Sequence, residues 1–266
     1  RKEPTAAVKI LEPAAKRSPS DPELATLLGS AYMANKQFAE ARKIFERAEQ
    51  EQPYSATVQT RLALSKLALG DQETAIEHLK KAVDFDSKIG RAEVLLGMLQ
   101  IKKGNYDAAI TTAYDLARKE PQNPFPHNLA GAALMWAGER KKAQMRFLKA
   151  LKLAPAYAPA KYNLASLYLS ERKTGPARKL YMELLKQNKN DTRVMIELSK
   201  LAEGEGRIKE AIDWLDQVTK LKSKSIPPQI RLLSLLLRAG RNKDALLIAD
   251  ELENRYPTNQ NVLEAK

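Results

Sequence analysis

The stretch Leu27–Tyr32 (LLGSAY), followed by Ala41–Ala48 (ARKIFERA) and then Pro53, decides the fold of this chain. Its apolar residues recur three and four positions apart. Leu24, Leu27, Leu28 and Tyr32 would share one face of a helix, and Ala41–Ala48 contains a second such face. We therefore expect two amphipathic helices that pack together, with Pro53 closing the unit.

The same pattern recurs along the whole chain with a period of 34 residues. An alanine occupies the equivalent position without a slip at Ala7, Ala41, Ala75, Ala109, Ala143, Ala177, Ala211 and Ala245. Glycines fall between the two expected helices at Gly70, Gly104, Gly138, Gly206 and Gly240. A left-handed backbone conformation costs glycine least, so these positions are expected to end the first helix. An internal repeat of this length predicts an all-α solenoid of stacked helix pairs.

This pattern resembles the tetratricopeptide repeat, and it matches that repeat column by column at Leu28, Gly29, Tyr32, Ala41, Phe45, Ala48 and Pro53. The resemblance implies a right-handed superhelical solenoid of helix-turn-helix units. Seven repeats then run over residues 22–55, 56–89, 90–123, 124–157, 158–191, 192–225 and 226–259. Residues 1–21 fit the second helix of a preceding, truncated repeat, and residues 260–266 fit the start of a further one. We therefore expect the chain to be a piece of a longer array.

Within this class, Leu27–Tyr32, Leu62–Asp71 and Asn128–Ala133 resemble the tetratricopeptide lipoproteins of bacterial PEP-CTERM/exosortase systems. Those proteins are encoded alongside exopolysaccharide genes. The resemblance implies a periplasmic scaffold, anchored to the membrane through a segment missing from this chain, that supports exopolysaccharide or PEP-CTERM protein export. Two alternatives stay open: a cytoplasmic adaptor, or the recruiting arm of an enzyme whose catalytic domain lies outside this chain.

The composition argues against catalysis by the 266 residues themselves. The chain has no cysteine, which excludes thiolate metal sites, disulfides and cysteine nucleophiles. Its two histidines, His78 and His127, belong to no metal-binding motif. The longest apolar run, within residues 232–237, is far shorter than the roughly 18–20 residues that span a bilayer. We predict a non-catalytic interaction protein with no metal site and no cofactor.

The family frame places a partner-binding groove on the first helices of the repeats. In this family, positions 2, 5, 9, 12 and 13 of each repeat line the concave side, chiefly to bind proteins or peptides. At repeats three to five this frame selects Val94, Met98, Ile101, Phe125, Asn128, Met135, Trp136, Tyr162, Ser166 and Leu169. An exposed set of Met, Trp, Phe and Tyr is typical of a protein-binding surface. The alternative is that several of them, Met98 and Ile101 first, pack between repeats.

The remaining groove positions narrow the range of expected partners. The carboxylate clamp of chaperone-binding members needs lysine and asparagine where this chain has Thr26, Thr60, Val94, Ser30, Leu64 and Met98, which argues against a chaperone tail. Toward the C-terminal end the groove is expected to become charged, through Arg193, Lys200, Glu203, Arg231 and Arg238. An extended segment of mixed sequence would suit these positions.

The net charge of +13 is concentrated in two repeats, 124–157 and 158–191, which carry nine of the thirteen charges. Most of these cations fall on second helices and are expected to face outward as a basic convex patch of Lys141, Lys142, Arg146, Lys149, Lys152, Lys173, Lys179 and Lys186. Anionic lipid headgroups or an acidic polysaccharide would suit such a patch. The absence of interleaved aromatic residues argues against nucleic acid, and a merely solvated basic face is the plain alternative.

Overall fold

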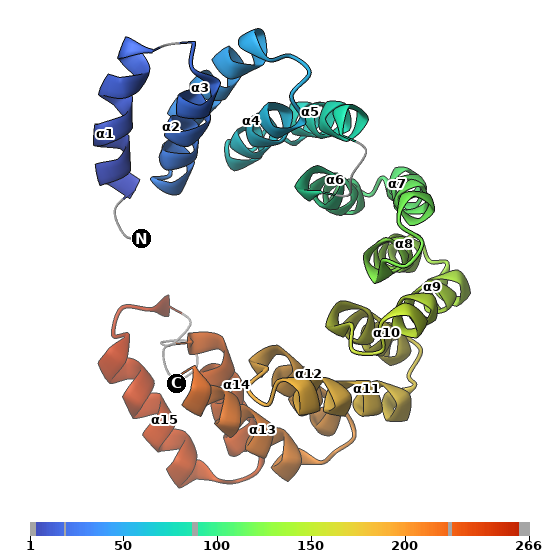
Figure 1. Cartoon of the computed structure of the whole chain (residues 1–266). Helices are drawn as coiled ribbons and strands as arrows, with labels where there is room; N and C mark the ends of the chain where they lie inside the picture. Colours follow the sequence, from blue (N-terminus) through green and yellow to red (C-terminus); the bar gives the residue numbers. More distant parts are fainter. Residues whose placement is uncertain (1–3, 19, 87–89, 223–224, 261–266) are drawn as a thin grey trace. The chain divides into compact units, whose positions relative to one another are not determined.

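The computed structural model describes residues 4–18, 20–86, 90–222 and 225–260, and in these ranges the chain forms fifteen α-helices (Figure 1). The first helices of the repeats are α2 (Pro22–Ala34), α4 (Ala56–Ala68), α6 (Arg91–Lys102), α8 (Pro124–Trp136), α10 (Ala158–Ser170), α12 (Thr192–Gly204) and α14 (Ile226–Arg238). The second helices are α1 (Pro4–Arg17), α3 (Phe38–Glu51), α5 (Gln72–Phe85), α7 (Tyr106–Lys119), α9 (Arg140–Leu153), α11 (Thr174–Gln187), α13 (Ile208–Leu221) and α15 (Asn242–Arg255).

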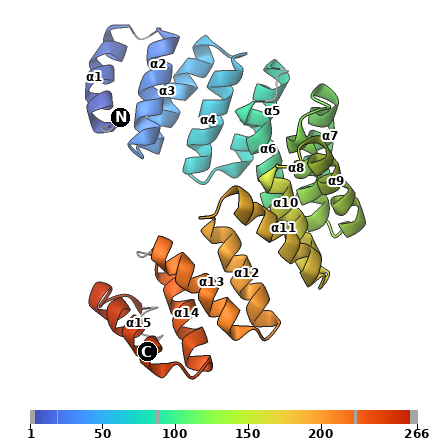
Figure 2. The same ribbon diagram turned by 60° about the horizontal axis from the view of Figure 1, so that its bottom comes forward.

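Within α1–α9 and within α10–α15, each helix packs against the next in sequence, as α2 does with α3 and α8 does with α9 (Figures 1 and 2). The chain is therefore an all-α helical solenoid built from helix pairs, which confirms the predicted fold class. It divides into two compact units, Arg1–Leu153 with α1–α9 and Ala154–Lys266 with α10–α15. The right-handed winding of the array stays a prediction. The expected start of a further repeat lies, from residue 261 onward, outside the described residues.

Local sequence signals set the helix ends. The carboxylate of Asp21 accepts hydrogen bonds from the backbone N–H groups of Glu23 and Leu24, at 2.9 and 3.1 Å, and Pro22 occupies the first helical position. At the other end, Gly138 has φ of +83°, the left-handed conformation expected between paired helices. Lys36 and Arg172 adopt the same conformation without being glycine, with φ of +61° and +59°.

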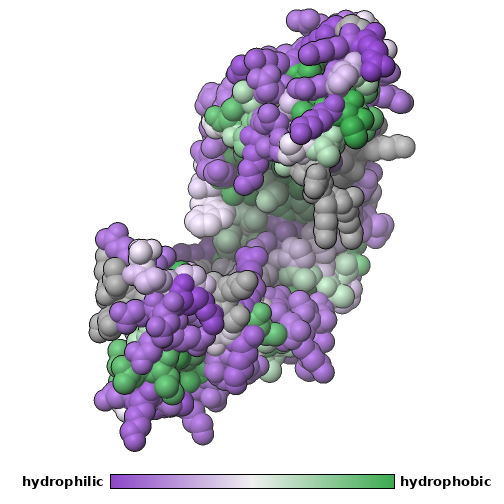
Figure 3. All heavy atoms as spheres, turned by 90° about the vertical axis from the view of Figure 1, so that its left-hand side faces the viewer, coloured by the Kyte–Doolittle hydropathy of each residue, from purple (hydrophilic) through white to green (hydrophobic). Residues whose placement is uncertain are grey.

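The core of each unit is made by the alanine column and the large residues that face it. In the N-terminal unit, Ala41, Phe45 and Tyr32 pack with Leu62 of the following repeat. In the C-terminal unit, Ala177 and Tyr181 pack in the same way with Leu198. Hydrophilic side chains predominate on the face drawn in Figure 3, and hydrophobic ones gather there in separate clusters.

One expected core residue lies elsewhere. Leu27 was predicted on the packed face with Leu24 and Leu28, but 56% of its surface is exposed. The reason is that Leu28 occupies the centre of the buried stripe, with Ala31 and Tyr32 beside it, so that Leu27 is turned to the edge of that stripe.

Candidate functional site

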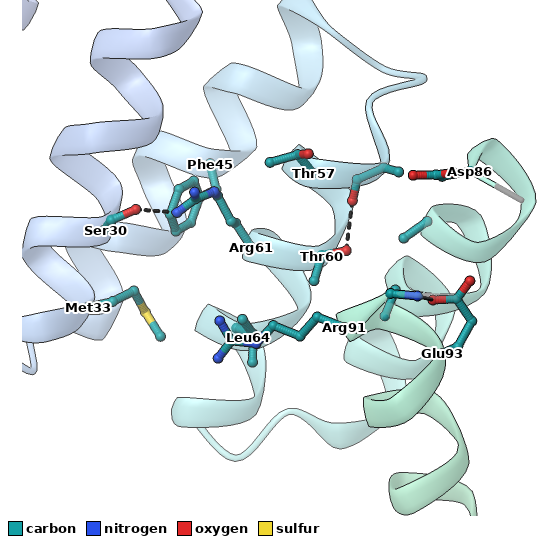
Figure 4. Close-up of a pocket in the computed structure, with 14 residues that line it drawn as sticks. Ser30, Met33, Phe45, Thr57, Thr60, Arg61, Leu64, Asp86, Arg91 and Glu93 are labelled. Carbon is teal, nitrogen blue, oxygen red and sulfur yellow. Dashed lines mark hydrogen bonds between the residues drawn. The ribbon is translucent and has the colours of Figure 1, made fainter. Parts of the chain in front are cut away.

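The N-terminal unit contains a cavity of about 470 Å³ between α2, α4 and α6 (Figure 4). Its wall combines hydroxyl groups, apolar side chains, the guanidinium groups of two arginines and the carboxylates of Asp86 and Glu93. The residues that line it include Ser30, Met33, Thr57, Thr60, Arg61, Leu64 and Arg91. The three helices come from successive repeats, so the fold itself brings these side chains together.

Arg61 extends from α4 toward α2, where its guanidinium Nη1 donates a hydrogen bond to the hydroxyl oxygen of Ser30. Ser30 is held in place because its own hydroxyl donates to the carbonyl oxygen of Thr26 at 2.6 Å. The Nε atom of Arg61 is buried and has no hydrogen-bond partner among the described residues. The pKa of Arg61 is lowered by burial first and by the positive charge of Arg91 second.

Arg91, the first residue of α6, is exposed and extends toward Leu64 (Figure 4). In the part of the chain that the structure describes, neither Arg61 nor Arg91 forms an ion pair with a carboxylate. The carboxylates of Asp86 and Glu93 line the same cavity, so in formal charge two acidic groups balance the two guanidinium groups. The exposed guanidinium of Arg91, which has no ion pair with a described carboxylate, can meet an anionic group, and Met33 and Leu64 provide apolar contact beside it.

The remaining polar groups in the wall are occupied mostly by their own helices. Thr60 donates its hydroxyl to the carbonyl oxygen of Ala56 at 2.7 Å. Glu93 is buried and accepts a hydrogen bond from the backbone N–H of Gly90 at 2.8 Å, which caps α6. Its second carboxylate oxygen, Oε1, is buried without a hydrogen-bond partner among the described residues. Both of these unpaired atoms are buried, so neither is open to the cavity as the side chains stand.

The predicted groove residues of the N-terminal unit lie on α6 and α8. Met98 and Trp136 are 59% and 63% exposed, so most of each side chain is accessible to a partner. Ile101 and Phe125, in contrast, pack partly against the core around Ala113 and Leu129. The alternative of packing between repeats was expected for both Met98 and Ile101, and in the structure Ile101 packs in this way whereas Met98 does not.

The other three groove residues of this unit contribute less surface. Val94 and Met135 are half-buried. Asn128 is buried and therefore does not belong to the open surface that was predicted, because α8 is buried on all sides over the turn from Pro126 to Gly131.

Tyr162, Ser166 and Leu169 lie on α10, in the C-terminal unit, and are half-buried. The groove residues are therefore divided between the two units. Tyr162 and Leu169 pack against the core around Ala165 and Tyr181. The guanidinium of Arg193 lies 3.6 Å from the centre of the Tyr162 ring, a cation–π contact.

The charged residues expected toward the C-terminal end are paired with one another. Glu203 forms ion pairs with both Arg231 and Arg238, and Lys200 pairs with Glu197 at 2.9 Å. Glu203 can balance the charge of only one of its two arginines, so this part of the C-terminal unit keeps an excess of positive charge.

The predicted basic patch is also divided between the units, and two of its members do not face freely outward. Arg146 is half-buried, with its guanidinium 4.5 Å from the centre of the Tyr114 ring. Lys173 pairs with Glu171 at 2.7 Å and lies over Tyr168. Lys142 is exposed and pairs with Glu139 at 2.8 Å. The exposed members with no ion pair among the described residues are Lys141, Lys149 and Lys152 on α9, and Lys179 and Lys186 on α11.

The cavity was not predicted from the sequence, although several residues that line it occupy groove positions of the repeat. Thr57 and Arg91 occupy position 2 of their repeats, Thr60 position 5, and Ser30 and Leu64 position 9. These are the groove positions of the first three repeats. The groove residues of repeats three to five were selected because most of them are apolar. The cavity lies instead at the first three repeats, where most of the groove residues that line it are polar or charged.

The two histidines have structural surroundings. Nδ1 of His78 lies 2.7 Å from Oε1 of Gln59, and burial lowers the pKa of His78. Burial also lowers the pKa of His127. Across residues 4–18, 20–86, 90–222 and 225–260, no three His, Asp or Glu side chains gather as they would to hold a metal ion. None of the helices in these ranges is both long enough and apolar enough to cross a membrane.

Models of the tetratricopeptide repeat match residues 1–64, 60–124 and 158–191. Tetratricopeptide repeat protein 21A of Mus musculus is 23% identical over 96% of this chain and 22% of its own length. The chain spans about a fifth of the length of the first curated relatives that it matches.

Solved structures show the same fold at lower identity. Yeast Tom70 is 18% identical with a TM-score of 0.75, covering 98% of this chain and 57% of Tom70. PilW, described as a widely conserved type IV pilus biogenesis factor, is 16% identical with a TM-score of 0.64, covering 79% of this chain and 97% of PilW. Repeat period, helix pairs and family models agree: the chain belongs to the tetratricopeptide-repeat proteins and has the fold of a protein–protein interaction scaffold.

Proposed function

We propose that this scaffold binds an extended partner segment carrying carboxylate groups, with the cavity between α2, α4 and α6 as its principal site. The observation that carries the proposal is the pair Arg61 and Arg91, which faces one cavity with no ion pair to a described carboxylate. A guanidinium is a planar donor suited to a carboxylate, and the guanidinium of Arg91 is exposed with no ion pair to a described carboxylate.

The rest of the segment would lie along the first helices of the same unit. Leu64 and Met33 offer apolar contact inside the cavity, and the exposed side chains of Met98 on α6 and Trp136 on α8 offer further contact outside it. Buried aromatic, apolar and Arg contacts supply most of the affinity of peptide grooves. The cavity would thus fix the position of one acidic residue, and the apolar side chains would hold its neighbours.

A panel of labelled nine-residue peptides with blocked ends tests this proposal. Each peptide carries Glu at one or two positions and is compared with its Gln counterpart by fluorescence anisotropy. We expect Glu peptides to bind more tightly than Gln peptides, and Arg61→Gln to remove that preference. Lys36→Gln, an exposed change outside the cavity, serves as the control. Equal affinity for Glu and Gln peptides would overturn the assignment of the cavity.

We further propose that the scaffold works at the bacterial envelope, in exopolysaccharide or PEP-CTERM protein export, on the periplasmic side and anchored to the membrane. The resemblance of Leu27–Tyr32, Leu62–Asp71 and Asn128–Ala133 to lipoproteins of those systems supports this proposal. The likeness to PilW concerns the fold alone.

Fractionation of the source cell, followed by sequencing of the mature N-terminus, tests the envelope proposal. We expect the protein in the membrane fraction, facing the periplasm, with a lipid-modified first residue. Recovery from the cytoplasm without modification would contradict it and favour the cytoplasmic adaptor. A non-repeat domain with catalytic motifs in the full reading frame would favour the recruiting arm of an enzyme.

A further inference from the structure

Helix α9 presents a basic surface that neither the core nor the cavity uses. Its sequence, Arg140–Leu153 (RKKAQMRFLKALKL), contains six Lys or Arg residues and no Asp or Glu. Ala143, Phe147 and Ala150 are fully buried, and they fix which side of the helix faces the core. The opposite side must therefore face solvent.

That solvent side is a continuous stripe of five exposed residues, Lys141, Met145, Leu148, Lys149 and Lys152. They are spaced at i, i+4, i+7, i+8 and i+11, which places them along one line of the helix. We call these five residues the α9 stripe. All of them belong to the N-terminal unit, so the stripe exists within one rigid element.

The three lysines of the α9 stripe are free to meet an anionic partner. Lys141, Lys149 and Lys152 form no ion pair with a described carboxylate. Neighbouring cations are already engaged, because Lys142 pairs with Glu139 and Arg146 lies over the Tyr114 ring. A partner that binds these three lysines must therefore be negatively charged.

The apolar members of the stripe decide which anionic partner fits. Met145 is 65% exposed and Leu148 is 46% exposed, and both lie between the lysines. A polysaccharide or a nucleic acid would contact the lysines and leave these two side chains against water. A membrane surface uses both kinds of residue, because lysines reach the phosphates while apolar side chains enter the boundary of the acyl chains.

We propose that the α9 stripe docks the N-terminal unit onto an anionic lipid surface. This contact is peripheral: three cations and two apolar side chains give reversible, salt-sensitive association and not insertion across the bilayer. The proposal is independent of the cavity, since no residue of the stripe lines it.

Vesicle sedimentation of the full chain tests the docking. Vesicles of phosphatidylcholine that contain about 30% of the anionic lipid phosphatidylglycerol are compared with vesicles of pure phosphatidylcholine. We expect binding only to the anionic vesicles. The variant Lys141→Gln/Lys149→Gln/Lys152→Gln should reduce the partition coefficient about tenfold or more. The matched control Lys16→Gln/Lys80→Gln/Lys119→Gln removes the same charge at exposed sites elsewhere in this unit and should change it far less.

A second variant separates lipid from other anions. Met145→Ser/Leu148→Ser should weaken binding to the vesicles about fivefold or more and leave binding to soluble polygalacturonate unchanged. Both side chains are exposed, so the helical spectrum should be preserved. Equal vesicle binding by this variant and the wild type would overturn the proposal, as would equal losses in the two lysine variants. Binding to polygalacturonate but not to anionic vesicles would assign the stripe to polysaccharide instead.

Discussion

Gly131 on α8 lies directly beneath the ring of Phe147 on α9: a Cβ atom added at Gly131 would lie 2.5 Å from Cε1 and 2.6 Å from Cδ1 of that ring. The same relationship recurs in the first full repeat, where a Cβ on Gly29 would lie 2.4 Å from Cε1 of Phe45. The small column therefore makes room for an aromatic ring of the paired helix. Phe147 is fully buried, so it has little freedom to move aside.

Gly131→Ala should consequently destabilise the α8–α9 pair by about 1–3 kcal/mol, the usual cost of overpacking a core. Repeat arrays need not unfold in one step, so the measurement is hydrogen exchange of the backbone amides of α8 and α9. Gly175→Ala is the matched control, since a Cβ there meets nothing within 4 Å. Unchanged exchange in Gly131→Ala would contradict the packing described here.

Stability should also depend on pH through His127. This side chain is buried, its Nδ1 has no hydrogen-bond partner among the described residues, and its pKa is lowered by burial first and then by Arg146 and Lys149. A folded pKa below the unfolded value of about 6.5 means that protonation favours the unfolded state. The stability is thus fully present above about pH 6.5 and is lost as the pH falls toward the folded pKa.

The unfolding temperature, measured from about pH 7.5 to about pH 5.5, tests this effect. This range extends about one unit on either side of the ordinary histidine pKa. His127→Gln should flatten the pH dependence, and His78→Gln should remove part of what is left because burial lowers the pKa of His78 as well. A variant that lacks both histidines yet loses stability as steeply as the wild type would show that other groups are responsible.

Lys161 is a buried cation that depends on one partner. Its Nζ lies 2.8 Å from Oε2 of Glu183, and the hydrogen bond from Lys161 lowers the pKa of Glu183. Glu183→Gln should destabilise the α10–α11 pair more than Lys161→Gln does, because the first leaves a buried charge unpaired and the second leaves a carboxylate that can still meet water. Hydrogen exchange of α10 amides distinguishes the two; equal effects would argue against the ion pair.

The sequence predicted the helix pairs well because repetition reinforces each signal. The alanine column and Gly138 are local features, and each places a helix end or a buried face without knowledge of the rest. Leu27 was misplaced because helical spacing alone does not distinguish the centre of a buried stripe from its edge.

The candidate sites were harder to predict because they depend on contacts between helices. Arg61 and Arg91 are 30 residues apart, and only the packing of α4 beside α6 brings them to one cavity. Likewise, the cation–π contact that removes Arg146 from the basic patch needs Tyr114 on α7. No spacing rule within one helix reveals such partners.

A double-mutant cycle between Arg61 and the acidic residue of a bound peptide tests the central claim most directly. The four affinities are those of the wild type and Arg61→Gln for the tightest Glu peptide and for its Gln counterpart. The account predicts a coupling free energy of about 1 kcal/mol or more, the value expected for a hydrogen-bonded charge pair that is partly buried. A coupling free energy of zero would contradict it, because the effects of Arg61→Gln and of the Glu-to-Gln change in the peptide on the binding free energy would then simply add.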